Sequence, residues 1–146
     1  MKYRINGDSD CPLAEVTLAK GEKVKIERGA MAYMSNVEIV GKMNANRKGL
    51  GGVLSAIGRS LTSGESMFIT QAQGLAEGSV IGIAPAIPGA ICKLEVGTKQ
   101  YRLNTGAFLA SDDSVNYVMK SQNLGKAFFG GTGGLYVMET EGHGDI

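Results

Sequence analysis

The chain has 146 residues, of which 43% are hydrophobic and 20% charged, and its formal net charge is +1. This length and composition are typical of one globular domain and exclude an intrinsically disordered chain and a uniformly basic nucleic-acid-binding surface. The 22 glycines follow no three-residue period, so a collagen-like fold is also excluded.

Short strands separated by turn residues are predicted along most of the chain. Residues 23–27 show the pattern most clearly, because charged and apolar residues alternate there as in a half-buried strand. The sequence PAIPG at 85–89 is predicted as a turn. The predicted strands are residues 1–5, 13–18, 23–27, 37–39, 66–73, 79–84, 91–96, 100–103, 107–110, 115–119 and 135–140.

One short helix is predicted near residues 52–61. Val53, Leu54, Ile57 and Leu61 recur at helical spacing between glycine-rich stretches. Many short strands with one helix predict an all-β sandwich or distorted barrel as the fold class.

The chain also contains an internal repeat, so the domain of residues 1–146 is predicted to be two similar β units. The first copy covers about residues 13–84 and the second about residues 90–146. Leu18 matches Leu94, and Gly29-Ala30-Met31 matches Gly106-Ala107-Phe108 after one extra residue; MFITQAQG (67–74) matches LYVMETEG (135–142). Two such units are expected to bury their apolar faces against each other. The second copy is expected to be cut short and to leave an exposed sheet edge.

Four motifs in one order resemble a known family. They are GGVLSAIGRSLTSGESMF, IAPAIPG, TGAFLASDD and FFGGTGGLYVMETEGHG, and the resemblance spans about residues 13–144. Together they are similar to the altered-inheritance-of-mitochondria family, whose bacterial members are mostly uncharacterised. The resemblance implies an all-β fold grouped with the tryptophan RNA-binding attenuator protein and a symmetric oligomer. It carries over no catalytic residue. The chain is short for this family, and Ala90 stands where many members have an acidic residue.

No catalytic or metal site is predicted. His143 is the only histidine, so neither a His-rich metal site nor a Ser-His-Asp arrangement can be assembled. Asp112 and Asp113 lie in the run SDDS, which is typical of a turn. The glycine-rich runs GLGG (49–52) and GGTGG (130–134) lack the Gly-Lys-Ser/Thr of a phosphate-binding loop. We therefore expect no enzyme and no cofactor.

Two candidate binding sites remain. The first is a basic patch around the predicted helix, which is a candidate for contact with phosphates of RNA or with lipid headgroups and consists of Lys42, Arg47, Lys48 and Arg59. The second is a small-molecule pocket inside the β structure, with Met31, Met67 and Phe108 as its expected lining.

The leading hypothesis is a non-enzymatic structural or interaction protein that works as a homo-oligomer, for which a trimer is one candidate. Nucleic-acid binding and small-molecule binding are the alternatives. No run reaches the roughly 18 apolar residues of a transmembrane helix, and the opening residues lack the apolar core of a signal peptide. Cys11 and Cys92 form no CxxC pair. Together these features lead us to expect reduced thiols in the cytoplasm of a bacterium.

Overall fold

The computed structural model describes residues 1–7, 10–43, 68–121 and 136–146. Within these ranges the regular structure consists of strands β1 to β13 and one 3-10 turn, η1 (Thr105–Ala107). All strand pairs are antiparallel. The predicted all-β fold is therefore confirmed, whereas the helix expected near residues 52–61 lies outside the described residues. No helix of the described ranges is long and apolar enough to cross a lipid bilayer.

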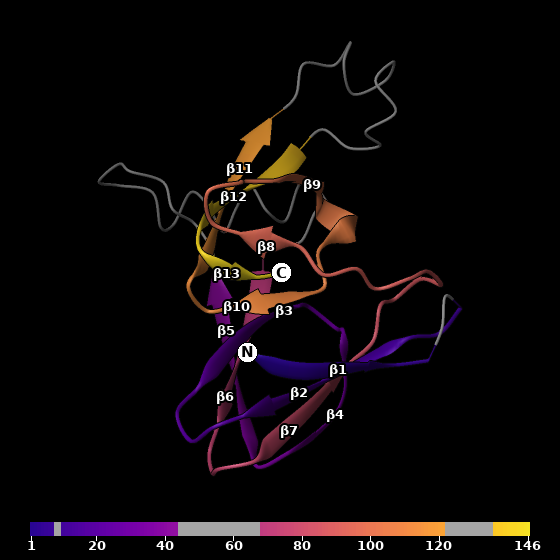
Figure 1. The fold of residues 1–146 in the computed structure, drawn as a ribbon, viewed down its shortest axis with the longest axis vertical. Coiled ribbons are helices and arrows are strands. Elements are labelled where there is room, and N and C mark those ends of the chain that lie inside the picture. Colours follow the sequence, from indigo (N-terminus) through magenta and orange to yellow (C-terminus); the bar gives the residue numbers. More distant parts are fainter. Residues whose placement is uncertain (8–9, 44–67, 122–135) are drawn as a thin grey trace.

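The first sheet has the strand order β1-β2-β7-β4 and occupies the lower part of the view in Figure 1. Its strands are β1 (Lys2–Asn6), β2 (Leu13–Leu18), β7 (Ser79–Ile83) and β4 (Met31–Ser35). In β2 the small and aliphatic residues Ala14, Val16 and Leu18 are buried at every second position. This alternation places one face of the sheet on the core, as the period of two in the sequence predicts.

The outer face of the first sheet carries a row of side chains that crosses all four strands. Arg4 Nη2 lies 2.9 Å from Glu15 Oε1, and the Tyr33 hydroxyl donates a hydrogen bond to Glu15 Oε2. The Tyr33 ring reaches Glu15 by lying across Gly82 of β7, and a Cβ atom at Gly82 would come within 2.4 Å of that ring. A glycine is therefore required at this position for the ring to lie flat on the sheet.

The central sheet has the order β10-β3-β6-β5, and its two inner strands carry buried side chains on both faces. Its strands are β10 (Ala110–Asp112), β3 (Lys23–Glu27), β6 (Phe68–Gly74) and β5 (Val37–Met43). Val24, Ile26 and Ala72 pack against the first sheet in one apolar cluster. Ile69 belongs to a second cluster, with Val115 and Tyr117 on the opposite side. The central sheet thus separates two cores.

A buried lysine on the second face of the central sheet corrects the expectation of a half-buried strand at 23–27. The side chain of Lys25 is only 8% exposed. Its Nζ donates hydrogen bonds to Asp113 O at 2.8 Å, Val115 O at 2.5 Å and Asn116 Oδ1 at 3.1 Å. Gln71 beside it donates a hydrogen bond to Asp113 Oδ1. Because these acceptors satisfy the ammonium group, it can be buried.

The remaining strands form a third sheet and a short ribbon. The third sheet has the order β11-β12-β9 and consists of β11 (Val115–Ser121), β12 (Tyr136–Gly142) and β9 (Arg102–Asn104). The ribbon pairs β8 (Glu95–Val96) with β13 (Gly144–Asp145). In Figure 1 the third sheet lies above β3 and β10, and both chain ends lie near the middle of the molecule.

The strand pairing has the same register in the two segments that the sequence predicts to be copies of one unit. In the hairpin of β5 and β6, Val37 pairs with Gly74 and the ladder runs for seven pairs to Met43 and Phe68. In the hairpin of β11 and β12, Val115 pairs with Gly142 and the ladder again runs for seven pairs. The next strand in each sheet also matches, because Lys25 pairs with Gln71 as Arg102 pairs with Glu139. Equal registers at matched positions are what a duplicated unit would produce.

Several element boundaries differ from those predicted. The strand β4 was not expected, and the predicted strand at residues 107–110 is instead the turn η1 followed by β10. The predicted strand at 91–96 is reduced to Glu95 and Val96. The turn predicted at Asp112 and Asp113 does connect β10 to β11, and PAIPG at 85–89 lies between β7 and β8 without strand structure, as predicted.

Asp112 joins the two ends of the chain to this turn. Its Oδ1 lies 2.8 Å from the Met1 α-amino group, and its Oδ2 accepts a hydrogen bond of 2.7 Å from the Asp145 backbone N–H. The Asp112 carboxylate accepts a hydrogen bond from the Met1 amino group and raises the pKa of that group above its ordinary value of 8.0.

Candidate binding pocket

A pocket of about 430 Å³ opens between the N-terminal strands β1 and β2 and residues 85–110. This volume is in the range of small-ligand and peptide-anchor sites. One wall comes from β1 and β2, another from residues 85–94, and a third from residues 103–110. Its principal apolar side chains are Tyr3, Ile5, Ile91, Leu94, Leu103 and Phe108.

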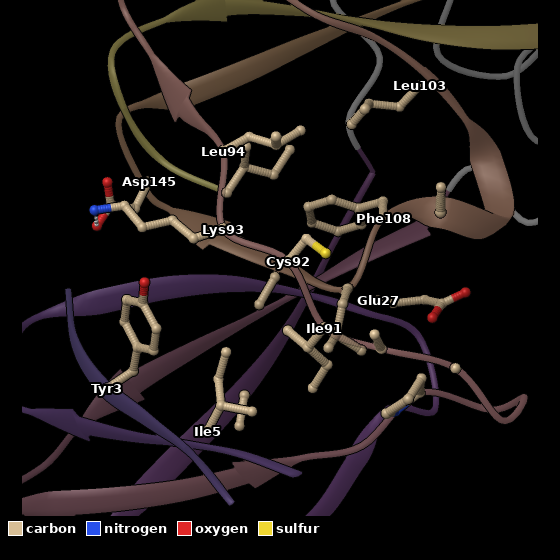
Figure 2. Close-up of a pocket in the computed structure, with 18 of the residues that line it drawn as sticks. Tyr3, Ile5, Glu27, Ile91, Cys92, Lys93, Leu94, Leu103, Phe108 and Asp145 are labelled. Atoms are coloured by element: carbon tan, nitrogen blue, oxygen red, sulfur yellow. Dashed lines mark ion pairs between the residues drawn. The ribbon is translucent and has the colours of Figure 1, made fainter. Parts of the chain in front are cut away.

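Phe108 lies at the centre of this arrangement (Figure 2). It follows η1 directly and is 3% exposed. Its ring contacts the ring of Tyr117 edge to face, with centroids 5.0 Å apart and an interplanar angle of 65°. Burial raises the pKa of Tyr117, whose hydroxyl donates a hydrogen bond to Ser111 Oγ. The two rings therefore form a fixed apolar wall, and the Tyr117 hydroxyl, their one polar group, has its hydrogen-bond partner in the core.

Charged groups are confined to two opposite sides of the pocket. On one side Lys93 Nζ pairs with Asp145 Oδ2 at 3.0 Å, and this hydrogen bond raises the pKa of Lys93. On the other side lies the carboxylate of Glu27 (Figure 2). Partial burial raises the pKa of Glu27. The pocket is thus an apolar cavity with one ion pair and one carboxylate at its margins.

Both cysteines of the chain are free and exposed, and one of them lies in the pocket. The Cys92 thiol lies next to the Phe108 ring in Figure 2, whereas Cys11 is not part of the pocket lining. The two thiols therefore form a matched pair for labelling experiments.

The described side chains do not assemble a metal site. No group of three or more His, Cys, Asp or Glu residues lies close enough to hold a metal ion within residues 1–7, 10–43, 68–121 and 136–146. His143 lies between β12 and β13 and is exposed.

The predicted site residues fall in different places. Phe108 lines the pocket, whereas Met31 is 40% exposed on β4 and does not contribute to the lining. Met67 lies outside the described residues. Of the basic patch, only Lys42 falls in a described strand, β5, and Arg47, Lys48 and Arg59 lie outside the described residues. Nucleic-acid binding through this patch stays a prediction.

The segment at 85–94 is the part of the pocket that sequence reasoning missed. It was interpreted as a turn followed by a strand. One signal in the sequence could have indicated this wall. Ile87 is an aliphatic residue within the proline-rich turn at 85–89, and Ile91 follows that turn closely. Ile87 is the most exposed large hydrophobic residue described, at 69%.

Comparison with known proteins assigns this β structure to a family. The family described as Mitochondrial biogenesis AIM24 matches residues 3–146, so the chain belongs to that family, and the resemblance to the altered-inheritance-of-mitochondria family is confirmed. An uncharacterized protein of Streptococcus pyogenes serotype M6 is 50% identical over 147 residues, which cover 100% of this chain and 59% of that protein.

A crystal structure of a second Streptococcus pyogenes protein, solved as a structural genomics target, has the same fold. It superposes with a TM-score of 0.72 at 46% sequence identity, and the match covers 99% of this chain and 62% of that protein. The chain therefore spans about three fifths of the length of these relatives. Neither relative's name states an activity, so both leave the function open.

Proposed function

We propose that this chain is a non-enzymatic interaction protein that binds an apolar partner in the pocket between its two sequence copies. The pocket itself is the observation that carries this proposal. Its walls are mostly aliphatic and aromatic, and its charged groups lie at the margins. Such a surface gains free energy by removing apolar area from water when a partner binds.

Self-association is the second part of the proposed function, and the edge strand β4 supports it. Met31, Tyr33 and Met34 of this strand are each at least 40% exposed. Large apolar side chains grouped on an edge strand are typical of a surface that pairs with another chain. We accordingly propose a homo-oligomer.

We also propose a bacterial cytoplasmic setting. Cys11 and Cys92 are free and exposed, which fits a reducing compartment. The two relatives described above come from a bacterium.

Selective labelling of Cys92 tests the pocket. Cys11→Ser leaves Cys92 as the reporter, and Cys92→Ser leaves Cys11 as the control thiol. An apolar fluorescent dye such as bis-ANS should slow maleimide labelling of Cys92 by severalfold and leave Cys11 labelling unchanged. Equal labelling rates with and without the dye, together with no fluorescence increase, would refute apolar binding at this site.

Native mass spectrometry tests the self-association. The unmodified chain should give an oligomer, and Met34→Glu should shift it towards the monomer because a charge would then lie on the edge strand. Lys2→Glu on β1 is the control, since Lys2 is exposed and β1 lies at the opposite edge of the same sheet from β4. A monomer at tens of micromolar for the unmodified chain would contradict the homo-oligomer.

A further inference from the structure

One carboxylate at the margin of the pocket has no cation beside it. Glu27 lines the pocket on the side opposite to Lys93 and Asp145 (Figure 2). Its side chain forms no ion pair or hydrogen bond with the residues that the structure describes. Two cations line the same pocket, and both are already paired. Lys93 pairs with Asp145 at 3.0 Å, and the Met1 amino group pairs with Asp112 at 2.8 Å. Neither cation therefore neutralises the charge of Glu27.

The backbone fixes the position of Glu27. Glu27 is the last residue of β3 and pairs with Ile69 of β6. Its N–H donates a hydrogen bond of 2.8 Å to Leu109 O, and its C=O accepts one of 3.1 Å from the Ala30 N–H. A functional group on a regular strand is held more precisely than one on a loop. The Glu27 carboxylate is thus an acceptor that is already in place beside the pocket.

The charge of Glu27 does not stabilise the fold. Burial raises the pKa of Glu27, so the ionised carboxylate is less favourable in the folded chain than in the unfolded chain. A positively charged group within hydrogen-bond distance would reverse this effect, because it favours the ionised form. A carboxylate of this kind in a cavity is a candidate for ligand binding.

We propose that the pocket binds a small apolar molecule that carries one positively charged amino group, with its apolar part against Phe108 and its ammonium on the Glu27 carboxylate. This inference rests on the proposed function, because it names the ligand class of that same pocket. It commits to a cation because Glu27 supplies the complementary charge, and to a small molecule because a volume of about 430 Å³ suits one.

Both parts of such a ligand gain free energy at this site. The apolar part is removed from water against Phe108, Ile91 and Leu103, which line the same cavity. The ammonium donates charge-assisted hydrogen bonds to the carboxylate, and these are stronger in a partly buried site than in water. A negatively charged head group would be repelled by Glu27. The pocket is therefore expected to select its ligands by the charge of the head group.

Three probes with one apolar part and different head groups test this selection. They are phenylbutylammonium, which is positively charged, phenylbutanol, which is neutral, and phenylbutyrate, which is negatively charged. Isothermal titration calorimetry at neutral pH measures their affinities for the unmodified chain. Slower maleimide labelling of Cys92 in the Cys11→Ser chain places a bound probe in the pocket, because the Cys92 thiol lies next to Phe108 (Figure 2).

Two variants separate the role of Glu27 from a general effect of charge. Glu27→Gln removes the carboxylate charge and keeps the size of the side chain. Because burial disfavours the ionised carboxylate, this variant should melt no lower than the unmodified chain. Glu38→Gln is the matched control, since it changes the net charge equally and Glu38 is exposed on β5 outside the pocket lining.

We expect the ammonium probe to bind about tenfold more tightly than the alcohol, and the carboxylate probe to bind more weakly than the alcohol. In Glu27→Gln the ammonium and the alcohol should bind within about twofold of each other, whereas Glu38→Gln should keep the difference. The ammonium probe should also slow the labelling of Cys92 and leave the labelling of Cys11 in the Cys92→Ser chain unchanged.

Three outcomes would overturn the proposal. Equal affinities of the ammonium and the alcohol, with Cys92 protected by both, would refute the amino group and leave apolar binding at the pocket intact. An ammonium preference that persists in Glu27→Gln would place the cation on another group. Absence of binding by all three probes at millimolar concentration would also refute it, and protection of Cys92 by bis-ANS would then show separately whether the proposed function holds.

Discussion

Replacement of Lys25 by methionine tests the polar contact between the central sheet and the second copy. Methionine keeps most of the length of the side chain and removes the ammonium group. The two backbone carbonyls at 2.8 and 2.5 Å and the Asn116 amide oxygen at 3.1 Å would then lose their donor. The change therefore isolates the hydrogen bonds from the packing of the alkyl chain.

The magnitude follows from the burial of the site. Lys25 is 8% exposed and the bond to Val115 O is buried, so water cannot fully replace the lost donor. A hydrogen bond to a charged group contributes about 1.5–3 kcal/mol, and removal of the ammonium also relieves its own desolvation. We expect a net loss of about 2–4 kcal/mol in the free energy of unfolding, which corresponds to a fall of roughly 6–14 °C in Tm.

Lys23→Met is the matched control. Lys23 lies two residues earlier on the same strand and on the same face, and its side chain forms no hydrogen bond or ion pair with the described residues. Thermal melting by circular dichroism and urea unfolding compare the two variants. If Lys25→Met and Lys23→Met melt within about 1 °C of each other, the buried ammonium does not hold the copies together and the reasoning is refuted.

Three other predictions concern glycines and the chain end. Gly82→Ala should displace the Tyr33 ring, because the new Cβ would lie 2.4 Å from it, and should lower the free energy of unfolding by about 1–2 kcal/mol. Gly97→Ala is the control, since its Cβ would have nothing within 4 Å and stability should change little. Equal melting temperatures of the two variants would contradict this prediction. Gly142→Ala should lower the free energy of unfolding by about 2–4 kcal/mol, because the φ of Gly142 is +93° and a Cβ would lie 2.5 Å from Ser114 O. Urea unfolding measures this free energy, and a decrease below about 1 kcal/mol would refute the prediction. The Asp112 carboxylate raises the pKa of the Met1 amino group, so the contribution of this ion pair to the free energy of unfolding is complete below pH 8.0 and is lost as the pH rises through the raised pKa. A chain acetylated at Met1 should lack this part of the pH dependence of stability. Identical stability profiles of the acetylated and unmodified chains would disprove the prediction.

Local pattern predicted the strands in which buried and more exposed side chains alternate. The range Leu13–Leu18 was predicted to the residue, because apolar side chains at every second position are enough to define it. Strand β4 was missed because Met31, Ala32, Tyr33 and Met34 do not alternate; the strand exists because it pairs with β7. Such pairing is a property of the folded chain and leaves no period in the sequence.

The candidate site was less predictable than the fold. Phe108 was named as a pocket residue and lies in the lining, but the wall at 85–94 could not be predicted because it depends on where distant segments lie in the fold. The alternation at residues 91–96 predicts a strand, yet only Leu94, Glu95 and Val96 are paired, with residues 144–146. The burial of Lys25 could not be predicted from the local sequence either, because the oxygen atoms that accept its hydrogen bonds lie about 90 residues away along the chain.

The central sheet also determines how this chain can fold. Its strand β10 comes from the second copy but pairs with β3 of the first, through Ala110 with Ile26 and Asp112 with Val24. Neither copy can complete this sheet alone, so a chain cut near residue 87 should yield two halves that do not fold separately. Because the strands to be joined are so far apart along the chain, the loop between them must close before the sheet forms. We therefore expect slow folding and a single unfolding transition that includes both copies.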